Sequence, residues 1–469
     1  MQQQVGWEKM MGLLFKVLLG SSFSIVFFFP SIALGSSGES PETDRVIVEI
    51  IDIEGNKEID SIAVDEVQSK LSRMIPSSSK DQVNVLQPDY IRTIGMVQTT
   101  EEYTKSWGTT RVGTDRMKSQ FATNGEEVVI AVIDTGVDYT HSFLKERMIA
   151  GYDFVDNDTD PMDEHYHGTH VAGIIAESTT ANIKIMPIRA LNHTGNGYDS
   201  NIAKGIRYAV DNGASIVNMS FQGNEYSEHL AQAINYALSN DVLVVVSSGN
   251  LSGDTANYYP ASEKKVLVVS ATDQSDKIAT FSNTGGSIDI SAPGVGIISS
   301  VPGEKYAVLH GTSMAAPYVS GVAAMLIVDN PTNSIIEIEK TLKSYVDDKG
   351  AVNWDPLFGE GILNVSNYEK YSLINSAFSS SDYTNLPEHS DVPLDKKWTI
   401  LFNQVFSDES IVAVKLYTAN YEVPVKLTPD LANKKIMVAP LENYQANTKY
   451  LLEIQVKDGK RYLMRFKTK

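Results

Sequence analysis

The sequence predicts an α/β protein whose main domain is a doubly wound, mostly parallel β-sheet. The first observation is a series of short segments that are apolar on both faces, as expected of strands in a buried parallel sheet. The second is that amphipathic segments of helical length separate them, which indicates repeated strand–helix units. The predicted strands cover 128–133, 183–188, 216–219, 242–246 and 266–269, and the predicted helices cover 171–177, 200–212, 226–240 and 313–329.

Two smaller units are expected to flank this domain. Before it, 46–51 and 83–86 predict strands and 62–74 predicts an amphipathic helix, which indicates a small α+β unit. After it, the polar segment 376–392 predicts a linker. Short strands separated by turn residues then indicate a C-terminal β-sandwich, similar to bacterial Ig-like domains. These strands are expected at 398–402, 412–416, 435–438, 450–454 and 461–468.

Composition excludes several classes of protein. The chain has 469 residues, with 39 Lys and Arg against 58 Asp and Glu, so its net charge is −19. That charge argues against nucleic acid as a partner, because a phosphate backbone would be repelled. There are no cysteines, which excludes disulfides and thiolate metal sites.

The N-terminus has the pattern of a secretory signal peptide. Lys9 and Lys16 accompany an apolar run at 11–34, and small residues follow it, which places a cut after Gly35. An uncleaved membrane anchor is the alternative, since the run is long. No other segment is long and apolar enough to span a bilayer. The expectation is therefore a secreted, extracellular protein, or a cell-surface protein if the anchor is kept.

Three short motifs bring together the residue types of nucleophilic catalysis. Asp134 lies in Val-Ile-Asp-Thr-Gly, His167 opens His-Gly-Thr-His-Val-Ala-Gly, and Ser313 lies in Gly-Thr-Ser-Met-Ala-Ala-Pro. A serine hydroxyl needs a base within reach, and the base needs an orienting acceptor. In the order Asp, His, Ser, these motifs resemble the subtilisin-like serine proteases of family S8.

The resemblance implies a role for each of these residues. Ser313 would be the nucleophile, His167 the general base and acid, and Asp134 the group that orients His167. Asn250, in Ser-Ser-Gly-Asn after a predicted strand, matches the family's oxyanion asparagine and would act beside the Ser313 N–H. An extended peptide would pair with two edge segments. The substrate-binding set is Gly195, Asn196, Gly197, Ser220, Phe221, Gln222, Gly223, Ser248, Gly249 and Tyr258.

Some of these positions depart from the family pattern. Phe221 and Gln222 replace the usual Leu-Gly, which changes the expected shape of the outer pocket. Tyr258 stands where many members have a small residue, so the primary pocket is expected to be shortened or to have a polar floor. The peptide bond between Tyr259 and Pro260 matches one that is cis in the family.

The resemblance also implies a zymogen. Residues 1–35 would be the signal peptide, 36–100 a propeptide that assists folding and inhibits the enzyme, and 105–373 the catalytic domain. A linker at 374–392 and an Ig-like domain at 393–469 would follow. Maturation would cut between 90 and 106, with Glu101-Glu102 as a candidate, and the product is expected to be a monomer. An unrelated small domain is the alternative for 36–100.

No cofactor is expected. His165, His167 and His170 are spaced like metal ligands, but Thr169 stands where a metallo-hydrolase motif has aspartate, so His170 is predicted to be structural. Secreted subtilisins often have a calcium loop after the catalytic histidine. Here that loop is missing, because 174–180 leads almost directly into the next strand, and Phe143 occupies a usual ligand position. The acidic loop 156–160 could bind calcium weakly, but a solvated acidic loop without a bound ion is the prediction.

The predicted function is therefore a secreted serine endopeptidase that acts on peptides or proteins. A broad degradative protease and a dedicated processing peptidase, of the type that removes lantibiotic leaders, remain alternatives. The departures at Phe221, Gln222 and Tyr258 favour the second slightly. A non-catalytic surface-binding protein is a third class, against which the intact motifs argue.

Overall fold

The structure is a computed structural model of the whole chain, and it divides into two compact units, Met1–Asn367 and Tyr368–Lys469. The residues that it describes are 26–27, 45–51, 57–63, 82–94, 98–101, 104–121, 126–368, 383–387, 389–401, 411–417, 422–430, 432–444, 449–457 and 459–469. Most of the predicted signal peptide lies outside them, with β1 (Val26–Phe27) as the described part.

A nine-stranded sheet forms the centre of the first unit, in the order β17-β18-β14-β13-β12-β11-β7-β9-β8. Neighbouring strands pair in parallel along it, and β17 joins antiparallel at one edge. This is the predicted parallel sheet. The strands are β7 (Val128–Asp134), β8 (Tyr152–Asp153), β9 (Ile183–Arg189), β11 (Ile216–Met219), β12 (Leu243–Ser247), β13 (Leu267–Thr272), β14 (Ile290–Pro293), β17 (Val346–Asp347) and β18 (Ile362–Leu363).

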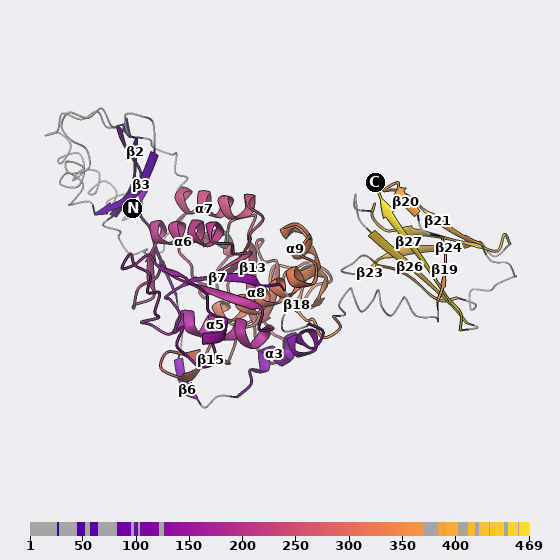
Figure 1. Cartoon of the computed structure of the whole chain (residues 1–469), viewed down its shortest axis with the longest axis horizontal. Coiled ribbons are helices and arrows are strands. Elements are labelled where there is room, and N and C mark those ends of the chain that lie inside the picture. The colour runs from indigo at the N-terminus through magenta and orange to yellow at the C-terminus, as the bar shows by residue number, and fades with distance from the viewer. Residues whose placement is uncertain are drawn as a thin grey trace. The chain divides into compact units, whose positions relative to one another are not determined.

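Helices cover both faces of this sheet, as a doubly wound fold requires (Figure 1). On one face lie α5 (His167–Ser178) and α8 (Thr312–Asp329), and on the other lie α6 (Asp199–Asp211) and α7 (Glu228–Ser239). Helix α8 is long and apolar enough to cross a membrane, but 83% of that stretch is buried inside the unit, as befits a core helix. Three shorter helices are α3 (Trp107–Val112), α4 (Thr114–Lys118) and α9 (Ile335–Ser344).

The predicted strands and helices of this unit are confirmed, with small shifts at their ends. The prediction for α5 began four residues late, because His167 and the residues after it gave no apolar periodicity. The structure buries almost every residue of that helix, so periodicity is a weak signal there. Strand β12 begins one residue after the predicted start.

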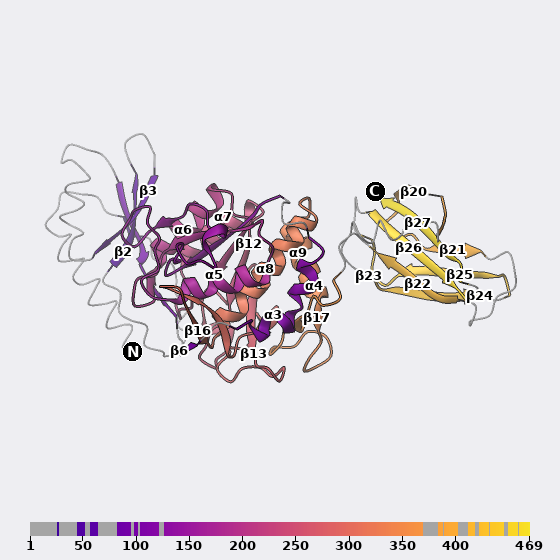
Figure 2. The same cartoon turned by 60° about the horizontal axis from the view of Figure 1, so that its bottom comes forward.

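Two small sheets join the region before the catalytic motifs to the main domain. Strand β5 (Ile91–Thr93) pairs antiparallel with β10 (Asn196–Tyr198). Strand β6 (Gln98–Glu101) pairs antiparallel with β16 (Lys305–Leu309), which also pairs with β15 (Ile297–Val301) (Figure 2). The chain is therefore held on both sides of residues 95–97.

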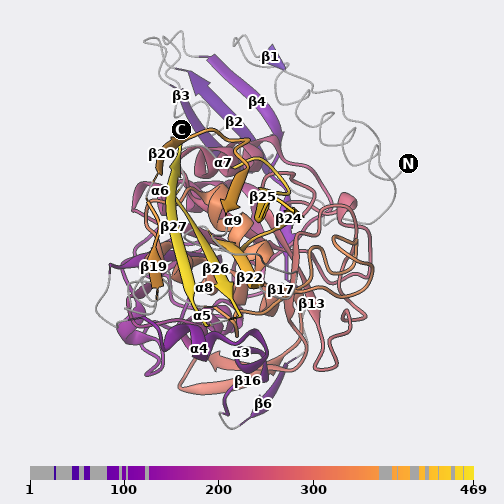
Figure 3. The same cartoon turned by 90° about the vertical axis from the view of Figure 1, so that its right-hand side faces the viewer.

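The N-terminal region contains a sheet in the order β1-β4-β2-β3, with β2 (Arg45–Ile51), β3 (Lys57–Ala63) and β4 (Gln82–Pro88) side by side (Figure 3). The predicted strands at 46–51 and 83–86 are confirmed. The prediction that a helix begins at Ile62 is wrong, because Ile62 lies in β3 opposite Val46 and is buried there. A short apolar run cannot distinguish strand from helix until its pairing is known. Residues 64–74 lie outside the described residues.

The second unit has two sheets around one hydrophobic core. A six-stranded sheet contains β19 (Tyr383–Asn385), β20 (His389–Val392), β22 (Ile411–Tyr417), β23 (Glu422–Val423), β26 (Lys449–Val456) and β27 (Arg461–Thr468). A three-stranded sheet contains β21 (Trp398–Leu401), β24 (Val425–Asp430) and β25 (Lys435–Pro440). Residues of both sheets, such as Leu416 and Val438, share the core.

Two of these strands correct the predicted linker. β19 and β20 fall within 376–392 and pair with β27. The residues of β20 are mostly polar and exposed, so this strand lacks the alternation that marks a half-buried strand. The Ig-like assignment of this unit stays a prediction.

Candidate active site

The predicted catalytic residues start from neighbouring strands at one edge of the sheet. Ile133 in β7 pairs with Met219 in β11, and Met219 pairs with Val246 in β12. Asp134 is the last residue of β7, Ser220 directly follows β11, and Asn250 lies a few residues beyond the end of β12. This is the carboxyl edge, where parallel α/β sheets place their ligand sites.

Asp134 and His167 form a close pair. His167 Nδ1 lies 2.6 Å from Asp134 Oδ1, and both side chains are fully buried. The same carboxylate oxygen accepts the N–H of Thr135 at 2.8 Å, which fixes its orientation. With its N–H donated to Asp134, the imidazole presents Nε2 as an acceptor, and that atom has no hydrogen-bond partner among the described residues.

The carboxylate of Asp163 links the segments that carry Asp134 and His167. Its carboxylate accepts the hydroxyl of Thr135 at 2.9 Å and both the N–H and hydroxyl of Thr169, at 2.9 and 2.6 Å. It thus ties the residue after Asp134 to the first turn of α5, which His167 opens. Burial raises the pKa of Asp163 to about 6, and the donors listed above lower it in part. No sequence motif marked Asp163.

Ser313 lies in the first turn of α8, where free backbone N–H groups favour negative charge. Its hydroxyl donates to the Ser220 carbonyl at 3.1 Å. Both Ser313 and His167 are described, and no hydrogen bond joins the Ser313 Oγ to Nε2 of His167 in this structure. Such contacts are often loose without substrate and form when it binds.

Asn250 is held against the start of α8 by Thr312. Its Oδ1 accepts the N–H and the hydroxyl of Thr312, each at 2.9 Å. The amide nitrogen Nδ2 of the same side chain lies close to Gly311. A Cβ at Gly311 would lie 3.3 Å from Nδ2 of Asn250 and 3.6 Å from N of Ser313. Two N–H donors thus lie near one another at the start of α8, as an oxyanion site needs. Thr312 was not predicted, although it stands inside the serine motif.

The two predicted edge segments hold the chain's own residues between them. Asn196 and Gly197 lie in β10 opposite Thr93 and Arg92, and the Gly195 carbonyl accepts the N–H of Ile94 at 3.3 Å. On the other side, Gln222 exchanges two backbone hydrogen bonds with Thr93, at 3.0 and 3.1 Å.

The remaining members of the second edge have different surroundings. Phe221 is buried in the hydrophobic core, and the Gln222 side chain accepts the N–H of Asn250 at 3.0 Å. Gln222 thereby links the edge to the asparagine, which the family pattern could not predict. Ser220 donates its hydroxyl to the carbonyl of Ser313 at 3.3 Å, and Gly223 exchanges backbone bonds with Tyr259.

The residues predicted for the primary pocket lie in one region. Ser248 donates its hydroxyl to the carbonyl of Asn283, and Gly249, at φ 103°, donates its N–H to the Thr312 hydroxyl at 3.1 Å. Tyr258 is half-buried, with its ring against Gly253, where a Cβ would lie 2.7 Å from ring atoms. The peptide bond between Tyr259 and Pro260 is cis, as predicted.

His170 packs in the core rather than facing the site. Its Nε2 lies 3.1 Å from the carbonyl of Ile297 and 3.0 Å from that of Ala307, so its N–H is shared between them. Burial lowers the pKa of His170 to about 3. This role is structural.

The low pKa predicts an acid-sensitive fold. The unfolded chain binds a proton at His170 below about pH 6.5 and the folded chain does not, so stability falls as pH drops from 6.5 toward 3. Between pH 6.5 and 5, we expect the free energy of unfolding to fall by about 2 kcal/mol less in His170→Asn than in its parent. The measurement is guanidinium unfolding against pH in an inactive Ser313→Ala background, with exposed His193→Asn as control. Parallel curves for His170→Asn and its parent would contradict this.

One carboxylate of the acidic loop, that of Asp156, is already paired with a cation. Arg189 already supplies a cation there, donating to Asp153 at 2.5 Å, to Asp156 at 2.6 Å and to Glu164 at 2.6 Å. A calcium ion would have to displace this guanidinium from its carboxylates. Within the described residues, no group of three or more His, Cys, Asp or Glu has a metal-binding arrangement.

The first unit is similar in sequence to a known family. The profile of the subtilase family, peptidase S8, matches residues 125–361. The thermophilic serine proteinase of Bacillus sp. (strain AK1) is 43% identical over 262 residues, which cover 54% of this chain and 61% of that protein, less than two thirds of its length. Subtilisin Savinase of Lederbergia lenta is 39% identical over 266 residues, 55% of this chain and 96% of that protein. The crystal structure of a cold adapted subtilisin-like serine proteinase has a TM-score of 0.49 and 32% identity, covering 54% of this chain and 97% of that chain.

Proposed function

Because the chain belongs to the subtilase family, whose subtilisin-like members are serine endopeptidases, we propose that it hydrolyses peptide bonds with Ser313, His167 and Asp134 as its catalytic triad. The observation that supports this most directly is the 2.6 Å contact between His167 and Asp134 at the sheet edge where Ser313 begins α8. The imidazole is oriented by Asp134, and its Nε2 has no hydrogen-bond partner in the part of the chain that the structure describes, as a general base requires.

The reaction would begin when the Ser313 hydroxyl turns from the Ser220 carbonyl toward Nε2 of His167. His167 takes the proton as Ser313 Oγ bonds to the substrate carbonyl carbon, and it then gives that proton to the leaving amine as the peptide bond breaks. Water hydrolyses the acyl-enzyme by the same route. Asp134 stabilises the imidazolium, and the N–H groups of Asn250 and Ser313 stabilise the oxyanion.

A zymogen is part of this proposal, because two segments that precede the catalytic domain, β5 and β6, pair with strands of that domain. Ile94 and the two residues before it bond to the substrate edges, and β6 then pairs with β16, whose last residue, Leu309, stands shortly before Ser313. Backbone pairing of an extended segment is also how a peptide substrate binds a strand edge, which supports the proposal. The pairing favours a cut within 94–98 over the predicted Glu101-Glu102.

Contacts upstream support an inhibitory propeptide. Asp89 accepts the N–H and hydroxyl of Ser200, at 2.9 and 2.6 Å, in the first turn of α6. Gln87 contacts the start of α7, accepting the N–H of His229 at 3.3 Å and donating to Ser227 at 3.0 Å. Carboxylate and amide oxygens at two helix N-termini fix the segment on the domain.

Secretion, with 1–35 as a cleaved signal peptide, also remains a proposal. The pattern of the first 35 residues supports secretion. A protease made as an inhibited precursor can also leave the cell before it becomes active. Peptides or proteins are the proposed substrates, and the Ig-like assignment of the second unit is part of the same proposal.

Maturation and active-site labelling test this function together. We expect the full-length chain to cut itself within 94–98, so that mass spectrometry finds a new N-terminus among residues 95–98, and a fluorophosphonate probe to label Ser313 in the product. Full-length Ser313→Ala, as the matched control, should stay uncut and unlabelled. Maturation of Ser313→Ala by itself, or a matured wild type that neither takes the label nor hydrolyses peptides, would sink the proposal.

A further inference from the structure

The chain's own segment places a charged side chain in a buried pocket beside the site. Arg92, in β5, is fully buried, and so is Asp199, the first residue of α6. The guanidinium donates through Nε to Oδ1 of Asp199 at 2.6 Å and through Nη2 to Oδ2 at 2.7 Å. Two parallel bonds of this kind fit the planar fork of arginine, whereas lysine offers a single ammonium.

The walls of this pocket also fit an arginine. The guanidinium carbon lies 5.5 Å from the ring centre of Tyr259, within the range of a cation–π contact. On another side, a Cβ at Gly223 would lie 2.3 Å from Nη1 and 2.8 Å from Cδ of Arg92, so only a glycine leaves room for the side chain there. A carboxylate, an aromatic face and a bare backbone therefore surround one cation.

This pocket belongs to the path of a substrate. Thr93, the next residue, exchanges both backbone hydrogen bonds with Gln222, whose side chain contacts Asn250. Side chains alternate along a strand, so the residue before Thr93 points away from it and toward the pocket. Any peptide that binds these edges in the same register brings a side chain to the place of Arg92.

The pocket carries a consequence for the mature enzyme. Among the described residues, Asp199 forms its ion pair with Arg92 and with no other cation. When the propeptide leaves, this carboxylate loses its partner. An unpaired buried charge is costly, so the Asp199 carboxylate favours a ligand whose cationic group takes the place of Arg92 in this pocket.

We propose that Asp199 selects substrates that carry arginine at the position that Arg92 occupies, two residues before Ile94 in the register of the chain's own cut site. This rests on the proposed function and names its substrate class: peptides with one arginine upstream of the cut, as a selective processing protease would require. Tyr259 and Gly223 shape the pocket, and Asp199 supplies the charge.

The test uses matured enzyme and peptides with the sequence of residues 89–101, so that the register is set by the chain itself. Four peptides carry Arg, Lys, Met or Glu at position 92. For the wild type we expect kcat/KM to be about 100-fold higher for the Arg peptide than for the Met peptide. A site closed to solvent can discriminate by about 10⁴–10⁵, but the pocket of the mature enzyme is open to water, so a smaller ratio is expected. The order should be Arg, Lys, Met, Glu.

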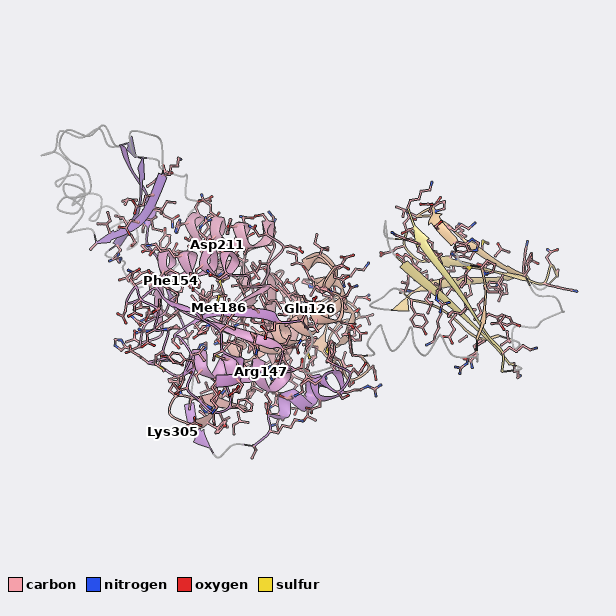
Figure 4. The ribbon with its side chains drawn as sticks, in the orientation of Figure 1. Glu126, Arg147, Phe154, Met186, Asp211 and Lys305 are labelled. Atoms are coloured by element: carbon pink, nitrogen blue, oxygen red, sulfur yellow. The ribbon has the colours of Figure 1, made fainter. Side chains whose placement is uncertain are left out.

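Enzyme variants then assign the preference. In Asp199→Asn we expect the ratio of kcat/KM for the Arg peptide over the Met peptide to fall to within about threefold. Asp211→Asn, at the exposed far end of the same helix (Figure 4), should keep the full preference. Unchanged selectivity in Asp199→Asn would overturn the role of Asp199.

The peptide series alone is decisive if Asp199→Asn does not fold. Wild-type enzyme that cuts the Arg and Met peptides equally, within threefold, overturns the arginine preference and leaves the serine endopeptidase intact. Wild-type enzyme that cuts none of the peptides, does not cut casein and takes no fluorophosphonate label overturns the proposed function itself. The two failures are thus distinguishable.

Discussion

Ser313→Ala is expected to lower kcat/KM for peptide hydrolysis by about 10⁶-fold, because the attacking oxygen is lost and only binding and oxyanion stabilisation remain. His167→Ala should lose about as much. The double variant should be no worse than either single one, since the two groups act as a unit. The inactive variants are first matured by a small amount of wild-type enzyme, which is then removed. The measurement is the steady-state rate at which they hydrolyse the 89–101 peptide.

A matched control is Ser239→Ala, an exposed serine at the end of α7, which should keep wild-type activity. Losses that add across Ser313→Ala and His167→Ala would indicate that the two residues act in separate steps. Comparable kcat/KM in Ser313→Ala and wild type would contradict the assignment of the nucleophile.

Asp134→Asn is expected to lower kcat by about 10⁴-fold with a small change in KM. Oδ1 of Asp134 accepts from both His167 and Thr135, so an amide in its place faces the imidazole with reduced charge or with an N–H group. An amide oxygen facing the ring does not stabilise the imidazolium as a carboxylate does. An amide N–H facing the ring holds it in the wrong tautomer. Both act on the chemical step and leave the substrate edges alone.

The kcat and KM of matured Asp134→Asn check this prediction, and the Nδ1 proton signal of His167 in NMR spectra adds a readout of the tautomer. Asp211→Asn serves as the control with an exposed carboxylate. A large rise in KM with kcat preserved would show that Asp134 acts through binding, against the orienting role argued here.

Much of the site could be predicted from the sequence because it lies in short, contiguous motifs. Asp134, His167 and Ser313 each end a strand or begin a helix, and parallel strands bring their carboxyl ends to one edge. The strands themselves were predictable from apolar runs such as 128–133, since a buried parallel strand has no polar face. These are local signals.

Contacts between distant segments could not be predicted. Thr312 reaches Asn250 across 62 positions of the chain, and Arg92 reaches Asp199 across 107. No local pattern records such pairs, because they depend on how strands and helices pack. Ile62 shows the same limit, since its partner Val46 decided that it lies in a strand.

The sequence by itself determined the reacting groups and the sheet that carries them, because both depend on residue type and short-range periodicity. Only the tertiary structure decided how a substrate lies and what it must carry. The course of 91–94 along Gln222 and the closure of a pocket around Arg92 arise from backbone pairing between segments far apart in the chain. In the sequence, nothing distinguishes Asp199 from other acidic residues at helix starts. In the structure it is fully buried beside the proposed path of the substrate.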